Sequence, residues 1–156
     1  MPHRCAISWN TSHPESTAKL RKMRGDLTFE SNFLSDFATK PFLTSMELIL
    51  DLSSILNGED RIRVLPSRSS IHGVITVGDI LKAVYRYLQR PLSSKELAYL
   101  SKVRSPKLLE AYQKMGNFRI PPSIRLIDCM EKTMFGGLER PAKGRGDVWR
   151  VVLCSQ

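Results

Sequence analysis

Three cations recur at four-residue intervals in the middle of the chain, namely Lys82, Arg86 and Arg90. On a helix this spacing places them on one face. Two tyrosines lie between them, and cations interleaved with aromatic rings suit stacking on nucleic-acid bases or docking of an acidic peptide. A solvated helix face would show the same pattern. The residues predicted to bind a partner are Lys82, Arg86, Arg90, Lys95, Tyr85 and Tyr87.

The charge of the whole chain has the same sign as this stripe. The 156 residues carry a formal net charge of +9, and the window 79–119 supplies +6 of it, with nine Lys or Arg residues against three acids. A localised positive excess suits an acidic partner, although net charge also serves solubility. No helix-turn-helix, zinc-finger or RNP motif accompanies the stripe. We therefore predict a non-enzymatic binding module that recognises an acidic protein or nucleic acid.

The residue types that most often carry catalysis or bind metals form no recognisable set. No cysteine lies in a CxxC pair or a nucleophile motif, and the histidine and cysteine spacing fits no standard zinc module. The sequence thus predicts no catalytic residue, metal site or cofactor. An odd number of cysteines argues against a disulfide framework and for a reducing compartment. The residues considered are His3, His13, His72, Cys5, Cys129 and Cys154.

One acid lies within an apolar pattern and carries the alternative hypothesis of an enzyme. Asp128 falls in the run 124–130, which predicts a strand. Arg125 is close in sequence, but side chains three apart on a strand point to opposite faces, so we expect a partner from another segment or exposure at an edge. In this alternative a pocket between the N-terminal residues and the sheet holds Trp9, Asp128 and Phe135. A third hypothesis is a structural or self-associating domain.

A helix is predicted to position the cationic stripe. Apolar residues at 77, 80, 81, 84 and 88 have the spacing of a helix laid on a core. Thr76 is placed as its N-cap, Asp79 favours the positive helix start, and Pro91 ends the pattern. This segment therefore specifies structure well.

Two further helices and several strands surround that helix. The pattern Ser93-x-x-Glu96 predicts a capping box for a helix to about 103, and Ser105-Pro106 starts a helix to Met115 with Leu108, Leu109, Tyr112 and Met115 as its apolar face. Strands are predicted at 42–52, 61–65, 124–130, 133–138 and 148–154, the first two forming a hairpin through Asn57-Gly58. The order predicts an α+β fold, with an antiparallel sheet of about four to five strands and two to three helices packed on one face.

The chain is predicted to hold one domain with an extension. Residues 1–37 read as an irregular N-terminal arm and 38–156 as a single α+β domain. The first residues lack the apolar stretch of a signal peptide, and no run approaches the roughly 20 apolar residues of a membrane span. We therefore expect an intracellular protein, cytoplasmic or nuclear.

Several short motifs, in this order, resemble a domain family of unknown function found in mushroom-forming (basidiomycete) fungi. The motifs are Trp9, Ala38-Thr39-x-Pro41, Val74-x-Thr76-Val77-x-Asp79-x-Leu81, Tyr85, Leu88, Pro91, Arg125-x-x-Asp128, Thr133-x-Phe135-x-Gly137-Leu138, and Trp149 with Val151 and Leu153. They span nearly the whole chain. The resemblance implies an intracellular fungal domain with no established activity.

Two positions depart from the pattern of that family. Asn10 follows Trp9 where the family usually has an aspartate, and the Glu59-Asp60 turn replaces the usual Pro-Trp before the second strand. If the missing acid or aromatic served a binding site in the family, that site is altered in this chain.

Overall fold

The computed structural model describes residues 6–21, 27–28, 33–68, 70, 72–116, 123–143 and 145–155. Its centre is a four-stranded sheet in the order β5-β4-β7-β6. The strands are β4 (Met46–Asp51), β5 (Glu59–Val64), β6 (Met134–Glu139) and β7 (Val148–Cys154). The predicted α+β class is confirmed, as is the hairpin of β4 and β5, which pairs Met46 with Val64 and Asp51 with Glu59.

The sheet is mixed rather than purely antiparallel, which corrects the predicted pairing. β4 and β7 run parallel, with Glu47 opposite Val148 and Leu50 opposite Val151, whereas β6 and β7 are antiparallel. A parallel pair needs a long crossover connection. Here the connection contains all the long helices, because β4 and β7 are separated by most of the domain.

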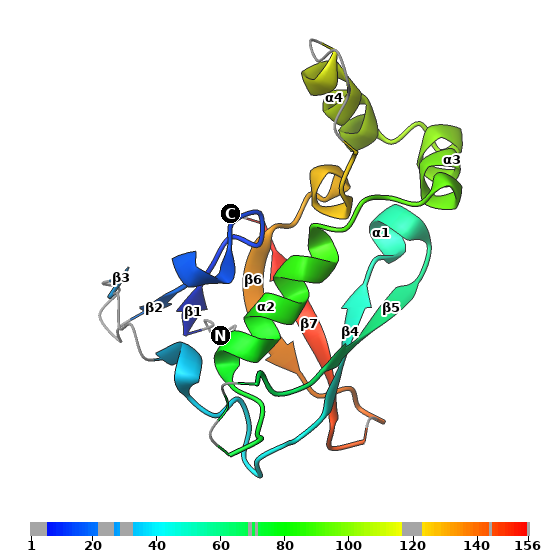
Figure 1. Cartoon of the computed structure of the whole chain (residues 1–156). Coiled ribbons are helices and arrows are strands. Elements are labelled where there is room, and N and C mark those ends of the chain that lie inside the picture. Colours follow the sequence, from blue (N-terminus) through cyan, green and yellow to red (C-terminus); the bar gives the residue numbers. More distant parts are fainter. Residues whose placement is uncertain are drawn as a thin grey trace.

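One helix, α2 (Val77–Leu88), lies across one face of the sheet (Figure 1). It starts in the predicted capping box: Thr76 Oγ1 accepts from the Asp79 N–H, and the Asp79 carboxylate accepts from the Thr76 N–H. Gly78 allows a close approach at this end, since a Cβ there would lie 2.9 Å from the carbonyl oxygen of Leu34 in the 3-10 helix η2 (Phe33–Ser35). The helix start is therefore fixed both by its own cap and by the chain that crosses it.

The other helices lie beyond one end of the sheet (Figure 1). They are α1 (Ser53–Leu56), α3 (Ser94–Lys102) and α4 (Pro106–Met115). The predicted caps of the last two are confirmed, with Ser93 accepting from the Glu96 N–H and Ser105 from the Leu108 N–H. The predicted apolar face of α4 is wrong in part, because Leu109 and Tyr112 are exposed while Leu108 and Ala111 are buried.

The stretch 124–130 is not a strand. It forms the 3-10 helix η3 (Leu126–Cys129), whose start is closed by Asp128 accepting from the Arg125 N–H. On this tight helix residues three apart share a face, so Arg125 Nη2 reaches Asp128 Oδ1 at 2.9 Å. The prediction that these two side chains would diverge is thus wrong, and the reason is the local hydrogen bond of the acid.

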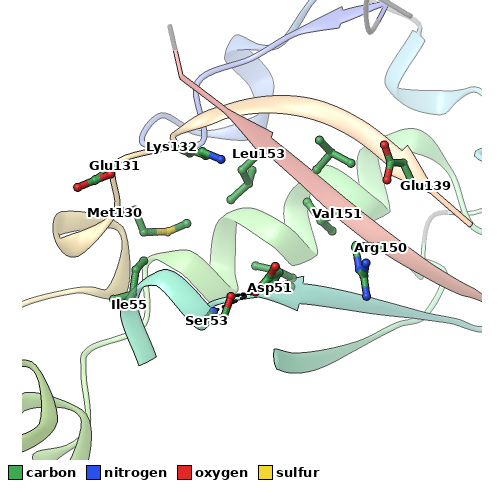
Figure 2. A pocket seen from close by; sticks show the side chains of 12 residues that line it. Asp51, Ser53, Ile55, Met130, Glu131, Lys132, Glu139, Arg150, Val151 and Leu153 are labelled. Carbon is green, nitrogen blue, oxygen red and sulfur yellow. Dashed lines mark hydrogen bonds between the residues drawn. The ribbon is translucent and has the colours of Figure 1, made fainter. Parts of the chain in front are cut away.

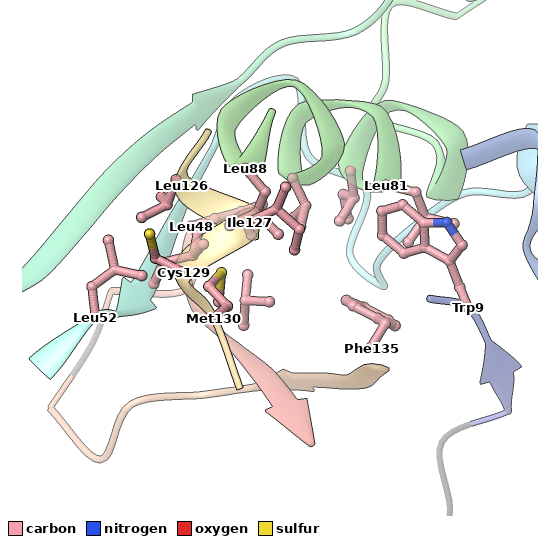
Figure 3. Close-up of a cluster of buried hydrophobic side chains, with 14 of the residues drawn as sticks. Trp9, Leu48, Leu52, Leu81, Leu88, Leu126, Ile127, Cys129, Met130 and Phe135 are labelled. Carbon is pink, nitrogen blue, oxygen red and sulfur yellow. The ribbon is translucent and has the colours of Figure 1, made fainter. Parts of the chain in front are cut away.

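The described part of residues 1–37 packs on the same core. Strands β1 (Ile7–Ser8), β2 (Lys19–Arg21) and β3 (Leu27–Thr28) form a small antiparallel sheet, with the 3-10 helix η1 (Glu15–Thr17) between the first two. Trp9 is buried against Phe135 under α2 (Figure 3). The division between arm and domain at residue 38 stays a prediction.

The core lies between α2 and the sheet. Leu81 and Leu88 of the helix face Leu48 of β4, and the residues of η3 close the end near Leu88 (Figure 3). Burial of each such side chain contributes about 2 kcal/mol to folding. No helix of the described residues has the length and apolar character needed to cross a membrane.

Candidate binding groove

A groove of about 500 Å³ separates the end of β5 from the outer side of α2. The end of the strand and the segment that follows it form one wall, and residues 79–86 of α2 form the other. We call this the basic groove. Its lining residues are Arg63, Val64, Leu65, Pro66, Ser67, Arg68, Asp79, Lys82, Ala83 and Arg86.

Four cations line the basic groove: Arg63 and Arg68 on the strand side, and Lys82 and Arg86 on the helix side. All four are exposed. Among the described residues, none of these four side chains takes part in an ion pair or a hydrogen bond. Each therefore keeps its charge and its donors available to a partner.

The one carboxylate in the described lining of the groove is held by internal hydrogen bonds. Asp79 is buried, and Oδ1 accepts from the Ser67 N–H at 3.1 Å while Oδ2 accepts from the Thr76 N–H at 3.0 Å and from Thr76 Oγ1 at 2.9 Å. It also lies at the positive end of α2, where a negative charge is stabilised. Asp79 thus ties the segment after β5 to the helix start, and the exposed groove surface stays cationic.

A second cavity of about 500 Å³ adjoins the groove and shares Ser67, Asp79 and Lys82 with it. Phe37 and His72 belong to its wall, and the Phe37 ring lies 4.5 Å from that of Phe42 and 6.1 Å from that of His72, centre to centre. Among the described residues no hydrogen bond reaches His72. This cavity therefore extends the surface of the basic groove beyond Lys82.

The predicted stripe of cations divides along α2. Lys82 and Arg86 line the basic groove, but Arg90, just past the helix end, is half-buried in a network of its own. Arg90 Nη2 and Nη1 contact the two carboxylate oxygens of Glu96 at 2.6 and 2.9 Å, and Nη2 lies 3.5 Å from Asp60 Oδ2. The Arg90 guanidinium also lies over the ring of Tyr87, 4.9 Å from its centre.

We call Asp60, Tyr87, Arg90 and Glu96 the closed network. It joins β5, α2 and α3, and the Tyr87 hydroxyl donates to Asp60 Oδ2. The hydrogen bonds from Arg90 and, next, from Ser93 lower the pKa of Glu96 to about 2. Burial and the bond to Asp60 raise the pKa of Tyr87 to about 12, and the bond to Glu96 raises the pKa of Arg90. The side chains at this end of the stripe therefore stabilise the contact of α2 with β5 and α3.

The remaining predicted binding residues lie outside the groove. Lys95 is exposed in the first turn of α3, and Tyr85 is half-buried close enough to Arg125 to act on its pKa. Neither lines the basic groove or the adjoining cavity. The structure therefore brings together two of the six predicted residues and adds two that the sequence pattern did not link to them.

Those two are Arg63 and Arg68. Arg63 lies in the run 61–65, which the sequence predicts as a strand, and Arg68 lies in the Ser-rich segment 66–73 between that strand and the helix. The spacing along the sequence does not relate Arg63 or Arg68 to Lys82. Their proximity depends on the pairing of β4 with β5 and on where α2 crosses the sheet. The signal available was the recurrence of arginine at positions 61, 63 and 68, shortly before the helix.

The residues of the enzyme hypothesis lie in different surroundings. Trp9 and Phe135 are both buried, with ring centres 6.0 Å apart, and the Trp9 indole N–H donates to the backbone oxygens of His13 and Pro14. Asp128 is half-exposed and paired with Arg125. None of the three lines any of the cavities described for this structure.

Another cavity, of about 430 Å³, lies where β4 ends and β7 continues past it (Figure 2). Its apolar floor includes Met130 and Val151. The charged rim holds the acids Asp51, Glu131 and Glu139 and the cations Lys132 and Arg150. Asp51 Oδ1 accepts from the Ser53 N–H at 3.0 Å and from Ser53 Oγ at 2.5 Å, which lowers its pKa. The mixed rim lacks the single sign that distinguishes the basic groove.

The described residues also offer no cluster of three or more His, Cys, Asp or Glu side chains that could hold a metal ion. Cys129 is buried, and this burial raises the pKa of its thiol to about 11. A thiol with such a raised pKa is a poor nucleophile at neutral pH.

Comparison with known proteins gives one match. A model of a family of unknown function (DUF6699) matches residues 7–146, which include both walls of the basic groove and the closed network. No curated protein and no solved structure matches the chain.

Proposed function

The chain belongs to a family of unknown function (DUF6699), and because membership assigns no activity, we propose from the groove alone that this domain is a module that binds an acidic protein segment. The observation that carries the proposal is the set of four exposed cations, Arg63, Arg68, Lys82 and Arg86, that line one groove. Cations without intramolecular partners raise the association rate and select acidic partners.

The composition of the groove favours a polypeptide over nucleic acid. The described lining of the basic groove itself holds no aromatic side chain, and the rings of Phe37 and His72 belong to the adjoining cavity. Leu65, Pro66 and Ala83 provide apolar surface between the charges of the groove. Single-stranded nucleic acid is usually held by stacking of bases on aromatic rings as well as by phosphate contacts. Tyr87, one of the aromatics expected to stack, is engaged by Asp60 in the closed network.

A charge-reversal pair tests the proposal. K82E/R86E removes both helix-side cations, and K95E/K102E makes the same change in charge on exposed residues of α3 that lie outside the groove. We expect the affinity for a polyglutamate peptide, measured by fluorescence anisotropy at low salt, to fall about thirty-fold in the first variant and less than about three-fold in the second. Equal losses in both would mean that net charge, not the groove, attracts the peptide.

A competition experiment separates the two classes of partner. Labelled polyglutamate bound to the wild-type protein is challenged with a pool of single-stranded DNA over a range of salt concentrations. We expect weak competition. Tighter binding of the DNA, with a steep linear fall of log affinity against log salt, would favour nucleic acid as the partner instead.

We also propose that the domain works inside a fungal cell, which is what the resemblance of its motifs to the domain of mushroom-forming fungi implies. Immunoblotting of the cell extract and the culture medium from the source organism tests the location. Recovery of the protein mainly from the medium would contradict it.

A further inference from the structure

The two outer strands of the four-stranded sheet have different surroundings. The edge of β6 is covered by the N-terminal residues, since the Phe135 N–H donates to the Trp9 oxygen at 2.9 Å and the Thr11 N–H to the Thr133 oxygen at 2.7 Å. β5 pairs with β4 on its inner side, and Figure 1 shows no described segment alongside its outer side. An uncovered edge presents backbone donors and acceptors to another chain.

The register of the hairpin identifies those backbone groups. The Leu52 N–H donates to the Gly58 oxygen at 2.9 Å, and the pairing of Asp51 with Glu59 continues from it without a shift. In an antiparallel ladder every second pair exchanges hydrogen bonds, so Asp60, Ile62 and Val64 bond to β4. The N–H and C=O groups of Glu59, Arg61 and Arg63 therefore point outward, and no described backbone group bonds to them.

The outward backbone of β5 leads directly into the basic groove, because Arg63 belongs both to this edge and to the groove lining. Side chains of a strand added at this edge would alternate between the two faces of the sheet. Those on the α2 side would approach Lys82 and Arg86, and those on the other side would approach Arg63, which is exposed on the face opposite the core. Acidic side chains would thus meet a cation on either face.

The geometry points to strand addition as the mode of recognition: an extended acidic segment of a partner protein pairs with the outer edge of β5 and lies in the basic groove. This inference rests on the proposed function and specifies it. Main-chain hydrogen bonds to β5 supply affinity that is independent of sequence, and the facing cations select acidic side chains.

A second copy of this chain is a poorer occupant of the same edge. It would bring the formal net charge of +9 and the same four groove cations towards a surface that already carries them. Charges of one sign repel each other, so an acidic segment suits this edge better than a second copy does.

The test separates the backbone of β5 from its charge. R63A removes the cation and keeps the outward N–H, whereas R63P also removes the N–H and places a proline where an edge strand tolerates one. With a short peptide of alternating glutamate and valine as probe, we expect R63A to weaken binding about three-fold and R63P about ten-fold beyond R63A. Thermal unfolding reports whether each variant is folded.

N-methylated peptides give the same information without changing the protein. Methylation of alternate amides on the edge of the peptide that faces β5 blocks the pairing, whereas methylation of the other amides does not. We therefore expect the affinity to fall about ten-fold for one set of methylated peptides alone. This comparison decides the matter if R63P fails to fold.

Three results would overturn strand addition. Equal binding by R63A and R63P, with both methylated peptides equal to the parent, would leave the acidic-partner function intact and remove the strand. A concentration-dependent dimer in sedimentation that R63P abolishes would assign the edge to a second copy. Absence of any binding to acidic peptides by the wild-type protein would refute the proposed function and this inference together.

Discussion

The two ends of the cationic stripe on α2 use the same residue types for different purposes. At the C-terminal end Arg90 is half-buried, with a side chain 27% exposed, and bonds Glu96 through two nitrogens. Lys82 and Arg86, within the helix, are exposed and line a groove together with Arg63 and Arg68. Asp60 of β5 and Glu96 of α3 contact Arg90. Asp79, the acid near Lys82, instead accepts hydrogen bonds from backbone N–H groups.

A periodic charge pattern therefore identifies one face of a helix and does not by itself identify a binding site. The same four-residue spacing joins residues that stabilise the fold and residues that are available to a partner. What separates them is the set of side chains that other elements bring to each end. The comparison can be tested at each end independently, since changes in the closed network should alter stability and changes in the basic groove should alter binding.

The largest expected effect on stability comes from R90A. Removal of the Arg90 guanidinium leaves Glu96 and Asp60 without their shared cation. Breaking such a half-buried pair costs about 2 kcal/mol of unfolding free energy. Urea unfolding followed by circular dichroism measures the loss. The affinity of the folded variant for polyglutamate should stay within about two-fold of wild type, because Arg90 does not line the groove. A large loss of affinity would mean that the two ends are not independent.

Acid should weaken the closed network in a defined pH window. The folded-state pKa of Glu96 is about 2, against an ordinary value of 4.5, so its carboxylate contributes stability that is fully present above pH 4.5. That contribution is lost as the pH falls from 4.5 towards 2. After allowance for solvent screening it amounts to about 1 to 2 kcal/mol. In E96Q the unfolding free energy should start lower and fall less over the same window, and an equally steep fall would assign the pH dependence to other acids.

D79N should affect both properties modestly and in opposite directions. The amide keeps an acceptor oxygen but loses the charge that favours the start of α2 and the bond to one of its backbone donors, which costs about 1 kcal/mol of unfolding free energy. The groove loses its carboxylate, so the affinity for polyglutamate should rise about two-fold. Thermal unfolding and peptide titration of one preparation measure both. A fall in affinity would indicate that Asp79 positions the groove wall mainly through its bond to Ser67.

The smallest effect is expected from single neutralisations. K82A should lower the affinity for polyglutamate about three-fold and leave the unfolding free energy within about 0.5 kcal/mol of wild type, since Lys82 has no intramolecular partner among the described residues. K102A is the matched control, because Lys102 is an exposed lysine outside the groove. If both variants bind equally well, the contribution of the groove is too small to be specific.

Much of the local structure could be predicted because its causes are local. The caps at Thr76, Ser93 and Ser105 act within three residues, and all three helices begin where these side chains predict. β7 covers the predicted range 148–154, since an apolar run bounded by a loop needs no other information. The same locality explains the error at 124–130, where apolar content resembled a strand but the Asp128 carboxylate closed a 3-10 turn on Arg125.

Periodicity, capping and charge are properties of neighbouring residues, so the sequence alone specifies the α+β class, the helix that carries Lys82 and Arg86, and the sign of the surface. The fold is needed for three other features: the parallel pairing of β4 with β7, the burial of Arg90 in the closed network, and the approach of Arg63 and Arg68 to α2. These depend on contacts between residues far apart in the chain, whose energies come from packing and pairing rather than from spacing. The groove is therefore a product of the fold, assembled from charges that the sequence places in separate elements.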